Sequence, residues 1–565
     1  MSSVNSGGGS PFPKWQIALA LGATGAIGLG YWYLRQQSKL VTVKKPSLKD
    51  TNSLSIDDKT VDDEKGDETP FQLSQRYKNE GNVLFKKGKY DEAISFYNKA
   101  IEICPEDQRH DLSTYYQNRA AAYEQLKKYS SVIADTSKAL EYNEKYEKAL
   151  YRRAKAYEAI KDWENCLDDI TAVCLLQGFQ NQNALLLADR VLKELGKQHA
   201  VEAIKNKKPI LPSKQFIKTY FMSFSEDPVY KMLLNTEEPM GDGVLSGFLK
   251  AKIAFATENF DDIIPACTEE INSSESESQY IFEALSLRAS FYLLSGSHQL
   301  ALDDFKTIVD AADANPKLRV NTLIKRASLH VQLEKPTECL EDFAKAVEID
   351  PDNSDIYHHR GQVNLLMDNT EEARRDFDKA VELNPNFAIA VVQKCYADYR
   401  YAMMTRNMEM LMESLTSFAK VTTRFSNFSE VFVLYGQVLT ERQDYQEAEK
   451  TFVKALELEP NNATILVHRG LLAIQSTSDM KKAIELINSA IELDDKCEFA
   501  YETLGTIEVQ RGNLVIAIDL FNKAIALART EIEMTHLFSL RDAAISQLKV
   551  TTKLGIGPQL LKPDM

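Results

Sequence analysis

The stretch "EEARRDFDKAVELNP", residues 371–385, decides the fold because a close copy precedes it in the chain. The copy is "TECLEDFAKAVEIDP", residues 337–351, which lies 34 residues earlier. Both share one spacing: a small residue, an aromatic four positions on, Ala three further, and Pro five beyond that. Five registered copies rarely arise by chance, so the chain is built from repeats. The remaining copies of this frame are Ala93/Tyr97/Ala100/Pro105, Ala448/Phe452/Ala455/Pro460 and Ala517/Phe521/Ala524.

The repeated unit has the pattern of two antiparallel helices. Small residues fit where the two backbones touch, an aromatic ring fills the gap beside them, and Pro ends the second helix. One unit cannot bury its apolar face alone, so successive units stack into a superhelix whose concave side is lined by the first helices. The period and the pattern resemble the tetratricopeptide repeat. The predicted fold class is therefore an all-α tetratricopeptide-repeat superhelix, preceded by one N-terminal transmembrane helix.

Counting in this frame predicts about eleven repeats in two domains. We expect an N-terminal three-repeat domain at 74–200, a junction at 201–243 and a C-terminal repeat domain at 244–565. Pro209 and Pro212 should interrupt any helix in the junction. The predicted repeats are 74–107, 113–146, 147–180, 244–277, 282–315, 320–353, 354–387, 388–425, 429–462, 464–497 and 498–531.

The composition is that of a folded protein, with 44% hydrophobic and 26% charged residues. A net charge of −15 argues against nucleic acid as a partner, because nucleic-acid binders display large basic surfaces. The seven cysteines are scattered without a CxxC pair, and the eight histidines show no metal-ligand spacing. We therefore expect neither a disulfide framework nor a metal or other cofactor.

Residues 15–34, "WQIALALGATGAIGLGYWYL", form an uncharged run of twenty residues. As a helix this run is ~30 Å long, which is the thickness of the hydrocarbon core of a bilayer. Aromatic residues stand at both ends of the run, and five Lys or Arg residues follow within residues 35–49, a flank that favours the cytosolic side. The Gly-rich, modestly apolar run favours a signal-anchor of the mitochondrial outer membrane. We predict a short tail in the intermembrane space (1–14), a transmembrane span (15–34) and a disordered acidic tether (35–73).

A set of cationic and amide side chains recurs on the first helices of the first three repeats. Residues four apart on a helix share a face, so these side chains should converge on one groove. Such a set suits a ligand with two carboxylates close together, because Arg grips one in a bidentate manner while Lys and Asn hold the other. The alternative is that the cations are ordinary solvated surface. The predicted set is Lys78, Asn82, Asn118, Lys148 and Arg152.

These residues, within "KNEGN", "QNRAAAY" and "EKALYRRA", resemble the dicarboxylate clamp of chaperone-binding tetratricopeptide domains. The resemblance implies that the groove holds the acidic C-terminal tails of the heat-shock protein 90 and 70 families. A longer loop at 104–113 is the one departure from that pattern.

Anchor, tether, clamp and further repeats together resemble the family of seventy-kilodalton receptors of the mitochondrial outer-membrane translocase, in its animal form. The stretches "LPSKQFIKTYF" (211–221), "IYHHRGQ" (356–362) and "AYETLGTIEVQRGN" (500–513) carry this likeness. The resemblance implies a non-enzymatic receptor that takes hydrophobic precursors, notably inner-membrane carriers, from cytosolic chaperones. It also implies other translocase subunits as partners, with transfer of the precursor to the import pore.

The precursor site is predicted from the same helix face in later repeats. A groove that mixes apolar and acidic side chains would suit an amphipathic segment with basic residues. The alternative is that these residues are inter-repeat core and plain solvated surface. The predicted residues are Asp355, His358, Gln362, Glu430, Gln437, His468, Phe499 and Glu502.

Two other readings compete with the receptor. An endoplasmic-reticulum co-chaperone would carry the same repeats behind a different anchor. An enzyme that uses the repeats as a dock would need a catalytic constellation, and no Ser/His/Asp, Cys/His or Gly-rich phosphate motif is evident in the sequence.

Overall fold

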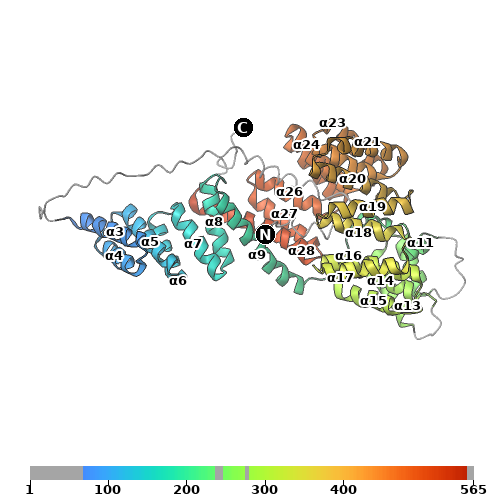
Figure 1. Cartoon of the computed structure of the whole chain (residues 1–565), viewed down its shortest axis with the longest axis horizontal. Helices are drawn as coiled ribbons and strands as arrows, with labels where there is room; N and C mark the ends of the chain where they lie inside the picture. The colour runs from blue at the N-terminus through green and yellow to red at the C-terminus, as the bar shows by residue number, and fades with distance from the viewer. Residues whose placement is uncertain (1–67, 236–245, 274–278, 557–565) are drawn as a thin grey trace, which may run out of the picture. The chain divides into compact units, whose positions relative to one another are not determined.

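The computed structural model describes residues 68–235, 246–273 and 279–556, and within these ranges every regular element is a helix. Figure 1 shows the helices stacked as successive hairpins. The predicted all-α repeat fold is confirmed. The predicted tail, the span at 15–34 and nearly all of the tether lie outside the described residues. Among the residues that are described, no helix is long and apolar enough to cross a membrane.

The helices pair in the frame that the sequence predicts. In the first three repeats the pairs are α3 (Pro70–Lys86) with α4 (Tyr90–Ile103), α5 (Arg109–Gln125) with α6 (Tyr129–Tyr142), and α7 (Glu147–Ile160) with α8 (Trp163–Leu176). The long helix α9 (Gln182–Lys205) follows them.

The later repeats continue in the same way. They comprise α12 (Gly247–Ala256) with the short 3-10 helix η1 (Phe260–Asp262) and α13 (Ile263–Asn272), α14 (Ile281–Ser295) with α15 (His298–Asp310), α16 (Pro316–Gln332) with α17 (Pro336–Ile349), α18 (Ser354–Leu366) with α19 (Thr370–Leu383), α20 (Ala388–Thr405) with α21 (Met408–Arg424), α22 (Ser429–Glu441) with α23 (Tyr445–Leu458), and α24 (Ala463–Thr477) with α25 (Met480–Leu493). The last helices are α26 (Glu498–Gln510), α27 (Leu514–Leu527) and α28 (Glu531–Leu554).

A glycine on the first helix lets the aromatic ring of the second helix approach within each of several repeats. A Cβ at Gly81 would lie 2.6 Å from the ring of Tyr97, and a Cβ at Gly436 would lie 2.7 Å from the ring of Phe452. Both rings are almost fully buried. The close approach explains why small residues and aromatics recur together in the repeat pattern.

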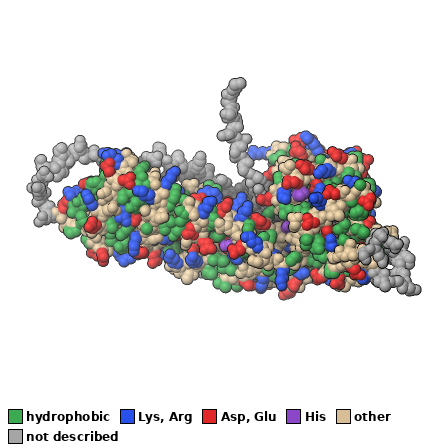
Figure 2. All heavy atoms as spheres, turned by 90° about the horizontal axis from the view of Figure 1, so that it is seen from below, with side chains coloured by type: hydrophobic (Ala, Val, Ile, Leu, Met, Phe, Trp, Pro, Cys, Tyr) green, Lys and Arg blue, Asp and Glu red, His purple; other side chains and the backbone are tan. Residues whose placement is uncertain are grey.

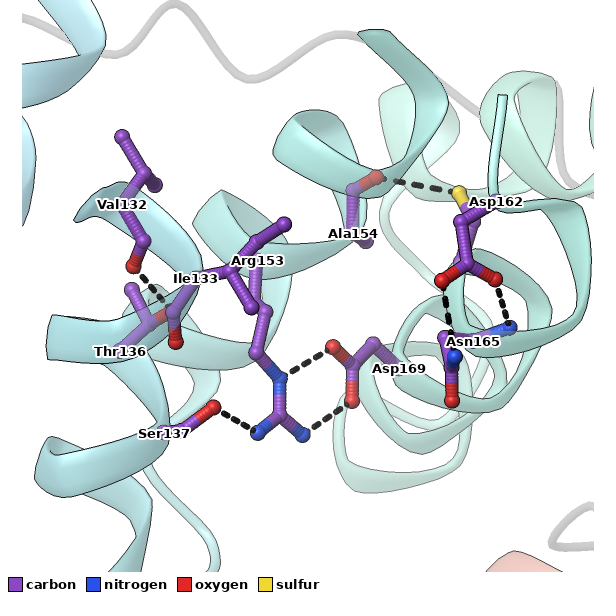
Figure 3. Close-up of polar contacts among 10 residues, drawn as sticks. Val132, Ile133, Thr136, Ser137, Arg153, Ala154, Asp162, Asn165 and Asp169 are labelled. Atoms are coloured by element: carbon purple, nitrogen blue, oxygen red, sulfur yellow. Dashed lines mark hydrogen bonds and ion pairs between the residues drawn. The ribbon is translucent and has the colours of Figure 1, made fainter. Parts of the chain in front are cut away.

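Five of the hairpins are also held together by a recurring ion pair that the sequence analysis missed. In Figure 3, Arg153 of α7 donates through Nε and Nη2 to Asp169 of α8, at 2.6 and 2.7 Å, and through Nη1 to Ser137 of α6 at 2.9 Å. One arginine thus holds its own hairpin together and contacts the preceding repeat. The same Arg–Asp pairing, 16 residues apart, recurs at Arg119–Asp135, Arg288–Asp304, Arg326–Asp342 and Arg360–Asp376.

The chain divides into two compact units, and the division differs from the predicted domains. Of the described residues, the smaller unit combines 68–199 with 506–519 and 537–556, and the larger unit contains those within 200–505 and 520–536. In the smaller unit, His199 Nδ1 lies 2.7 Å from Asp542, and Val550 and Leu554 join the core of the third repeat. The last described part of the chain therefore belongs with the first three repeats, because α28 supplies apolar surface to their core.

The predicted junction, 201–243, contains folded elements within its described residues, 201–235. Helices α10 (Lys214–Met222) and α11 (Pro228–Leu234) form within it, and Ser213 and Asp227 cap their N-termini with side-chain oxygens. Phe221 and Val229 are fully buried in the core of the larger unit. The prolines at 209 and 212 lie before α10 begins, so they confine the irregular stretch to the residues between α9 and α10.

The tether also ends earlier than predicted. Thr69 caps α3 in a reciprocal capping box with Gln72, and Pro70 occupies the first turn. The helix therefore starts at Pro70 instead of residue 74, because the capping residues precede the first residue of the repeat pattern.

Candidate functional site

The first helices α3, α5 and α7 contact one another and form one face of the smaller unit. On this face the structure brings two predicted residues into contact, because Asn118 of α5 donates its amide to Asn82 Oδ1 of α3 at 3.2 Å. Tyr97 of α4 donates its hydroxyl to the same oxygen at 2.8 Å. Asn82 is therefore held from two sides, and its orientation is fixed by the repeat packing. We call the face around Lys78, Asn82, Asn118, Lys148 and Arg152 the clamp surface.

Arg152 reaches back from α7 to α5. Its Nε donates to Glu124 at 2.7 Å, and its Nη1 lies 3.4 Å from the carbonyl oxygen of Gln117, the neighbour of Asn118. Arg152 and Glu124 keep 22% and 20% of their side chains exposed. The guanidinium is thus positioned next to the Asn82–Asn118 contact while part of it remains open to a ligand.

Glu124 lies beside this set and was not among the residues that the sequence analysis predicted. It also accepts a hydrogen bond from Lys155 Nζ at 3.0 Å. Burial alone would raise the pKa of Glu124, but the hydrogen bonds from Arg152 and Lys155 outweigh it and hold the pKa below its ordinary value. Glu124 is therefore ionised at neutral pH and orients Arg152.

Lys78 and Lys148 complete the clamp surface as unpaired cations. Lys78 is half-buried on α3 and Lys148 is exposed at the start of α7. Neither ammonium group forms a hydrogen bond or an ion pair with the described residues. Both are therefore available to bind an anion without first breaking an internal contact.

The predicted second groove is partly covered by the chain itself. Asp355 of α18 is 1% exposed and accepts hydrogen bonds from the backbone N–H groups of Ser225 and Glu226, at 2.9 and 2.8 Å. Burial raises the pKa of Asp355 to about 6 despite these donors. The prediction that Asp355 lines an open groove is corrected here, because residues between α10 and α11 lie over it.

His358 and Gln362 are also buried, at 0% and 4% exposure. The His358 ring lies edge-on to Phe387, with centroids 5.0 Å apart. Burial first, and then neighbouring His359, hold the pKa of His358 well below its ordinary value, so the ring is neutral. Among the described residues no group of His, Cys, Asp or Glu side chains is placed to hold a metal ion.

The remaining predicted groove residues divide into buried and accessible ones. Gln437 and His468 are buried and lie 3.3 Å apart through their side-chain nitrogens, which makes them part of the inter-repeat core. Glu430, Phe499 and Glu502 are half-buried. The Glu502 carboxylate is hydrogen-bonded to His536 Nε2 at 3.0 Å. Of the eight predicted groove residues, only Glu430, Phe499 and Glu502 keep part of their side chains exposed to a ligand.

Comparison with known proteins first defines the class. Models of the tetratricopeptide repeat match residues 74–107, 320–353, 354–387 and 429–462, which are four of the predicted repeats. The chain is a tetratricopeptide-repeat protein.

The particular family follows from relatives of nearly the same length. The mitochondrial import receptor subunit TOM70 of Rattus norvegicus is 45% identical over 98% of this chain and 94% of its own length. The human protein of the same name is also 45% identical, over 97% of this chain and 94% of its own. The chain belongs to the family of mitochondrial import receptor subunit TOM70, which confirms the predicted resemblance to the animal receptors.

A solved structure supports the fold. The crystal structure of yeast Tom70 is 24% identical and covers 86% of this chain and 99% of its own, with a TM-score of 0.50. The named relatives are mitochondrial import receptors, so they favour the predicted import receptor over the endoplasmic-reticulum co-chaperone and over an enzyme.

Figure 2 shows acidic and basic side chains intermingled on the face of the molecule that it draws. The net charge of −15 is thus not collected into one block on that face.

Proposed function

We propose that the chain is a non-enzymatic receptor for mitochondrial protein import. Residues 15–34 anchor it in the outer membrane as a single span, with residues 1–14 in the intermembrane space and the repeats in the cytosol. The repeats within 74–200 dock the acidic C-terminal tails of heat-shock protein 90 and 70 chaperones. The repeats within 244–565 receive hydrophobic precursors, inner-membrane carriers among them, and pass them to the import pore and other translocase subunits. Family membership supports the import role.

One observation carries the chaperone-docking part of this proposal. The Asn118–Asn82 contact joins two repeats at 3.2 Å beside two lysines that have no partner among the described residues. Lys78, Lys148 and Arg152 bring three positive charges and Glu124 brings one negative charge, which leaves a net charge of +2. A C-terminal Asp presents two carboxylates within one residue, and this surplus positive charge matches them.

The test is the binding of an acidic C-terminal peptide ending in Glu-Glu-Val-Asp to the full chain. We expect the free-acid peptide to bind at least tenfold more tightly than the same peptide with an amidated C-terminus, because amidation removes one of the two carboxylates. The readout is fluorescence anisotropy at fixed ionic strength. Equal affinity of the two peptides would remove the clamp from the proposal.

The precursor site is proposed on the residues of the second groove that remain accessible. Glu430, Phe499 and Glu502 combine one aromatic ring with two carboxylates, a set that suits an amphipathic segment with basic side chains. Glu430→Gln and Glu502→Gln should weaken a basic presequence-like peptide and leave a neutral apolar peptide unchanged. Equal losses for both peptides would contradict a direct charge contact.

Docking and delivery follow from tethering in this proposal. A chaperone held at the clamp surface raises the local concentration of its precursor near the second site, so transfer needs no new contact.

Fusion of residues 1–45 to a fluorescent reporter tests the proposed location in the mitochondrial outer membrane. A mitochondrial signal is expected, and a reticular signal would defeat the outer-membrane assignment.

A further inference from the structure

Residues 223–228, "SFSEDP", lie between α10 and α11 against the first helices α16 and α18, and we call them the inserted segment. Asp355 of α18 accepts the backbone N–H groups of Ser225 and Glu226, at 2.9 and 2.8 Å, and the hydroxyl of Ser225 at 2.7 Å. A carboxylate that binds successive backbone amides reads the main chain of a peptide and not its side chains. Successive N–H groups reach one carboxylate where the main chain turns, and residues 225 and 226 are bends, so this face holds a turn of peptide chain.

The acidic side chain of the inserted segment is bound by a lysine. Lys325 Nζ of α16 donates to Asp227 at 2.7 Å, and the two side chains are 1% and 0% exposed. The ammonium also lies over the rings of Phe221 and Phe224, 5.5 and 5.3 Å from their centroids. A charge this deeply buried is stable only while its partner stays in place.

The aromatic side chain of the inserted segment has its own partner. Phe224 stacks on His359 of α18 with ring centroids 4.2 Å apart and an interplanar angle of 28°. Burial lowers the pKa of His359 to about 3, so the imidazole is neutral and acts as a flat ring surface. Backbone, carboxylate and aromatic ring are thus each recognised by a different residue of α16 or α18.

These residues occupy the same places in the repeat as the clamp residues. Lys325 and His359 are the sixth residues of repeats 320–353 and 354–387, as Asn118 and Arg152 are of repeats 113–146 and 147–180. Asp355 is a second residue, as Lys148 is. Equivalent places on stacked first helices face the same side, so the inserted segment covers the surface that corresponds to the clamp surface.

We infer that the face of α16 and α18 is a peptide-binding site that the chain fills with its own residues Phe224–Asp227. The ligand class is a peptide that turns, with an aromatic residue followed, three positions later, by a carboxylate. While the inserted segment is in place, no precursor can use this part of the first-helix face. The inference does not rest on the proposed chaperone docking, since it concerns a different pair of repeats.

This face also carries polar side chains that lack a hydrogen-bond partner among the described residues. Asn321 lies four residues before Lys325 on α16, is 3% exposed, and both its amide atoms lack such a partner. The ring nitrogens of His358, at 0% exposure, also lack one among these residues. Buried polar groups are ordinarily hydrogen-bonded, so these atoms leave hydrogen-bonding capacity for a peptide that takes the place of the segment.

The test releases the inserted segment and offers it back in trans. In the full chain, Phe224→Ser with Asp227→Ser removes the ring and the carboxylate, while the hydroxyl introduced by the second substitution can still cap α11. We expect a fluorescein-labelled peptide of residues 221–230 to bind this variant at least tenfold more tightly than the unmodified chain. The same peptide with Asn in place of Asp227 should bind at least tenfold more weakly, and Lys325→Met in the released variant should abolish binding.

The opposite outcome is equally clear. If the released variant gains no affinity for the peptide, and its thermal midpoint is not raised by added peptide, the segment is plain core and the inference fails.

Hydrogen exchange on the unmodified chain covers the case in which the variant does not fold. We expect the amides of Ser225 and Glu226 to exchange at least tenfold faster than those in the middle of α16, because a replaceable ligand opens locally. Equal protection would overturn the inference.

Discussion

The clamp surface and the face under the inserted segment use equivalent repeat positions with opposite states. On the clamp surface, Lys148 is exposed and has no partner among the described residues. On α18, Asp355 has the same second place in its repeat, is 1% exposed and accepts the backbone N–H groups of Ser225 and Glu226. The contrast teaches that repeat position decides where a side chain faces, whereas the surrounding chain decides whether it is open to a partner.

The largest expected effect is on stability and comes from removing the buried Lys325–Asp227 ion pair beneath the inserted segment. Lys325→Met leaves the Asp227 carboxylate buried without a cation, and we expect a loss of about 3–5 kcal/mol in the free energy of unfolding of the larger unit. Hydrogen exchange of amides in α16 and α18 measures the loss. The double variant Lys325→Met/Asp227→Asn should recover a substantial part, since it removes the unpaired charge. No recovery would mean that the pair acts through packing alone.

The next largest effect is expected from acid, which should destabilise the face under the inserted segment through His359. His359 has a folded-state pKa of about 3, below its ordinary 6.5, so the unfolded chain binds the proton more readily. Its contribution is fully present above pH 6.5 and is lost as the pH falls toward 3. Between pH 6.5 and 5 the unmodified chain should lose about 2 kcal/mol relative to His359→Gln, from ~1.4 kcal/mol per pH unit. Parallel pH profiles from urea titrations of the two proteins would contradict this.

Packing within the two regions gives a smaller effect. A Cβ at Gly81 on the clamp helix α3 would lie 2.6 Å from Tyr97, but a Cβ at Gly361 on α18 would lie 3.1 Å from Phe377. Gly→Ala gains about 1 kcal/mol of helix propensity at either site. We expect Gly361→Ala to be nearly neutral and Gly81→Ala to cost about 1 kcal/mol net, because overpacking then exceeds that gain. The thermal midpoints of the two variants measure this difference in stability, and equal midpoints would contradict the explanation by overpacking.

The smallest effect on stability is expected at the open lysine. Lys148→Met should change the free energy of unfolding by no more than about 0.5 kcal/mol, because Lys148 has no described partner to leave unpaired. Compared with Lys325→Met, this variant measures the open side of the comparison. A loss as large as that of Lys325→Met would show that Lys148 is part of the fold.

Much of the fold was predictable because its signals are local and periodic. The spacing of Gly81, Tyr97 and their counterparts places several of the hairpins, and the period of 34 residues sets which first helices face the same side. That is also why Asn82 and Asn118 could be placed together. The Arg–Asp pairs were equally visible, since their spacing of 16 residues recurs in five repeats.

What the sequence did not predict depends on contacts that skip the repeat frame. Glu124 meets Arg152 from 28 residues away in the neighbouring repeat. Asp227 meets Lys325 across 98 residues, and Ser225 meets Asp355 across 130. A folded connection between repeats can fill a groove that repeat arithmetic leaves open, so Asp355, His358 and Gln362 were placed on the correct helix but in the wrong environment. The available signal was Lys325 at the sixth place of its repeat, directly after Leu323 and Ile324.

Binding of an acidic tail to single-lysine variants tests the central claim most directly. With the free-acid peptide ending in Glu-Glu-Val-Asp, Lys78→Ala and Lys148→Ala should each raise the Kd about tenfold or more, because each removes a charge-assisted hydrogen bond to a carboxylate. Lys87→Ala, an exposed lysine at the C-cap of the same helix α3 that points away from Lys78, is the matched control and should leave the Kd unchanged within about twofold. If all three variants weaken the peptide equally, only the general charge of the surface matters and no clamp exists.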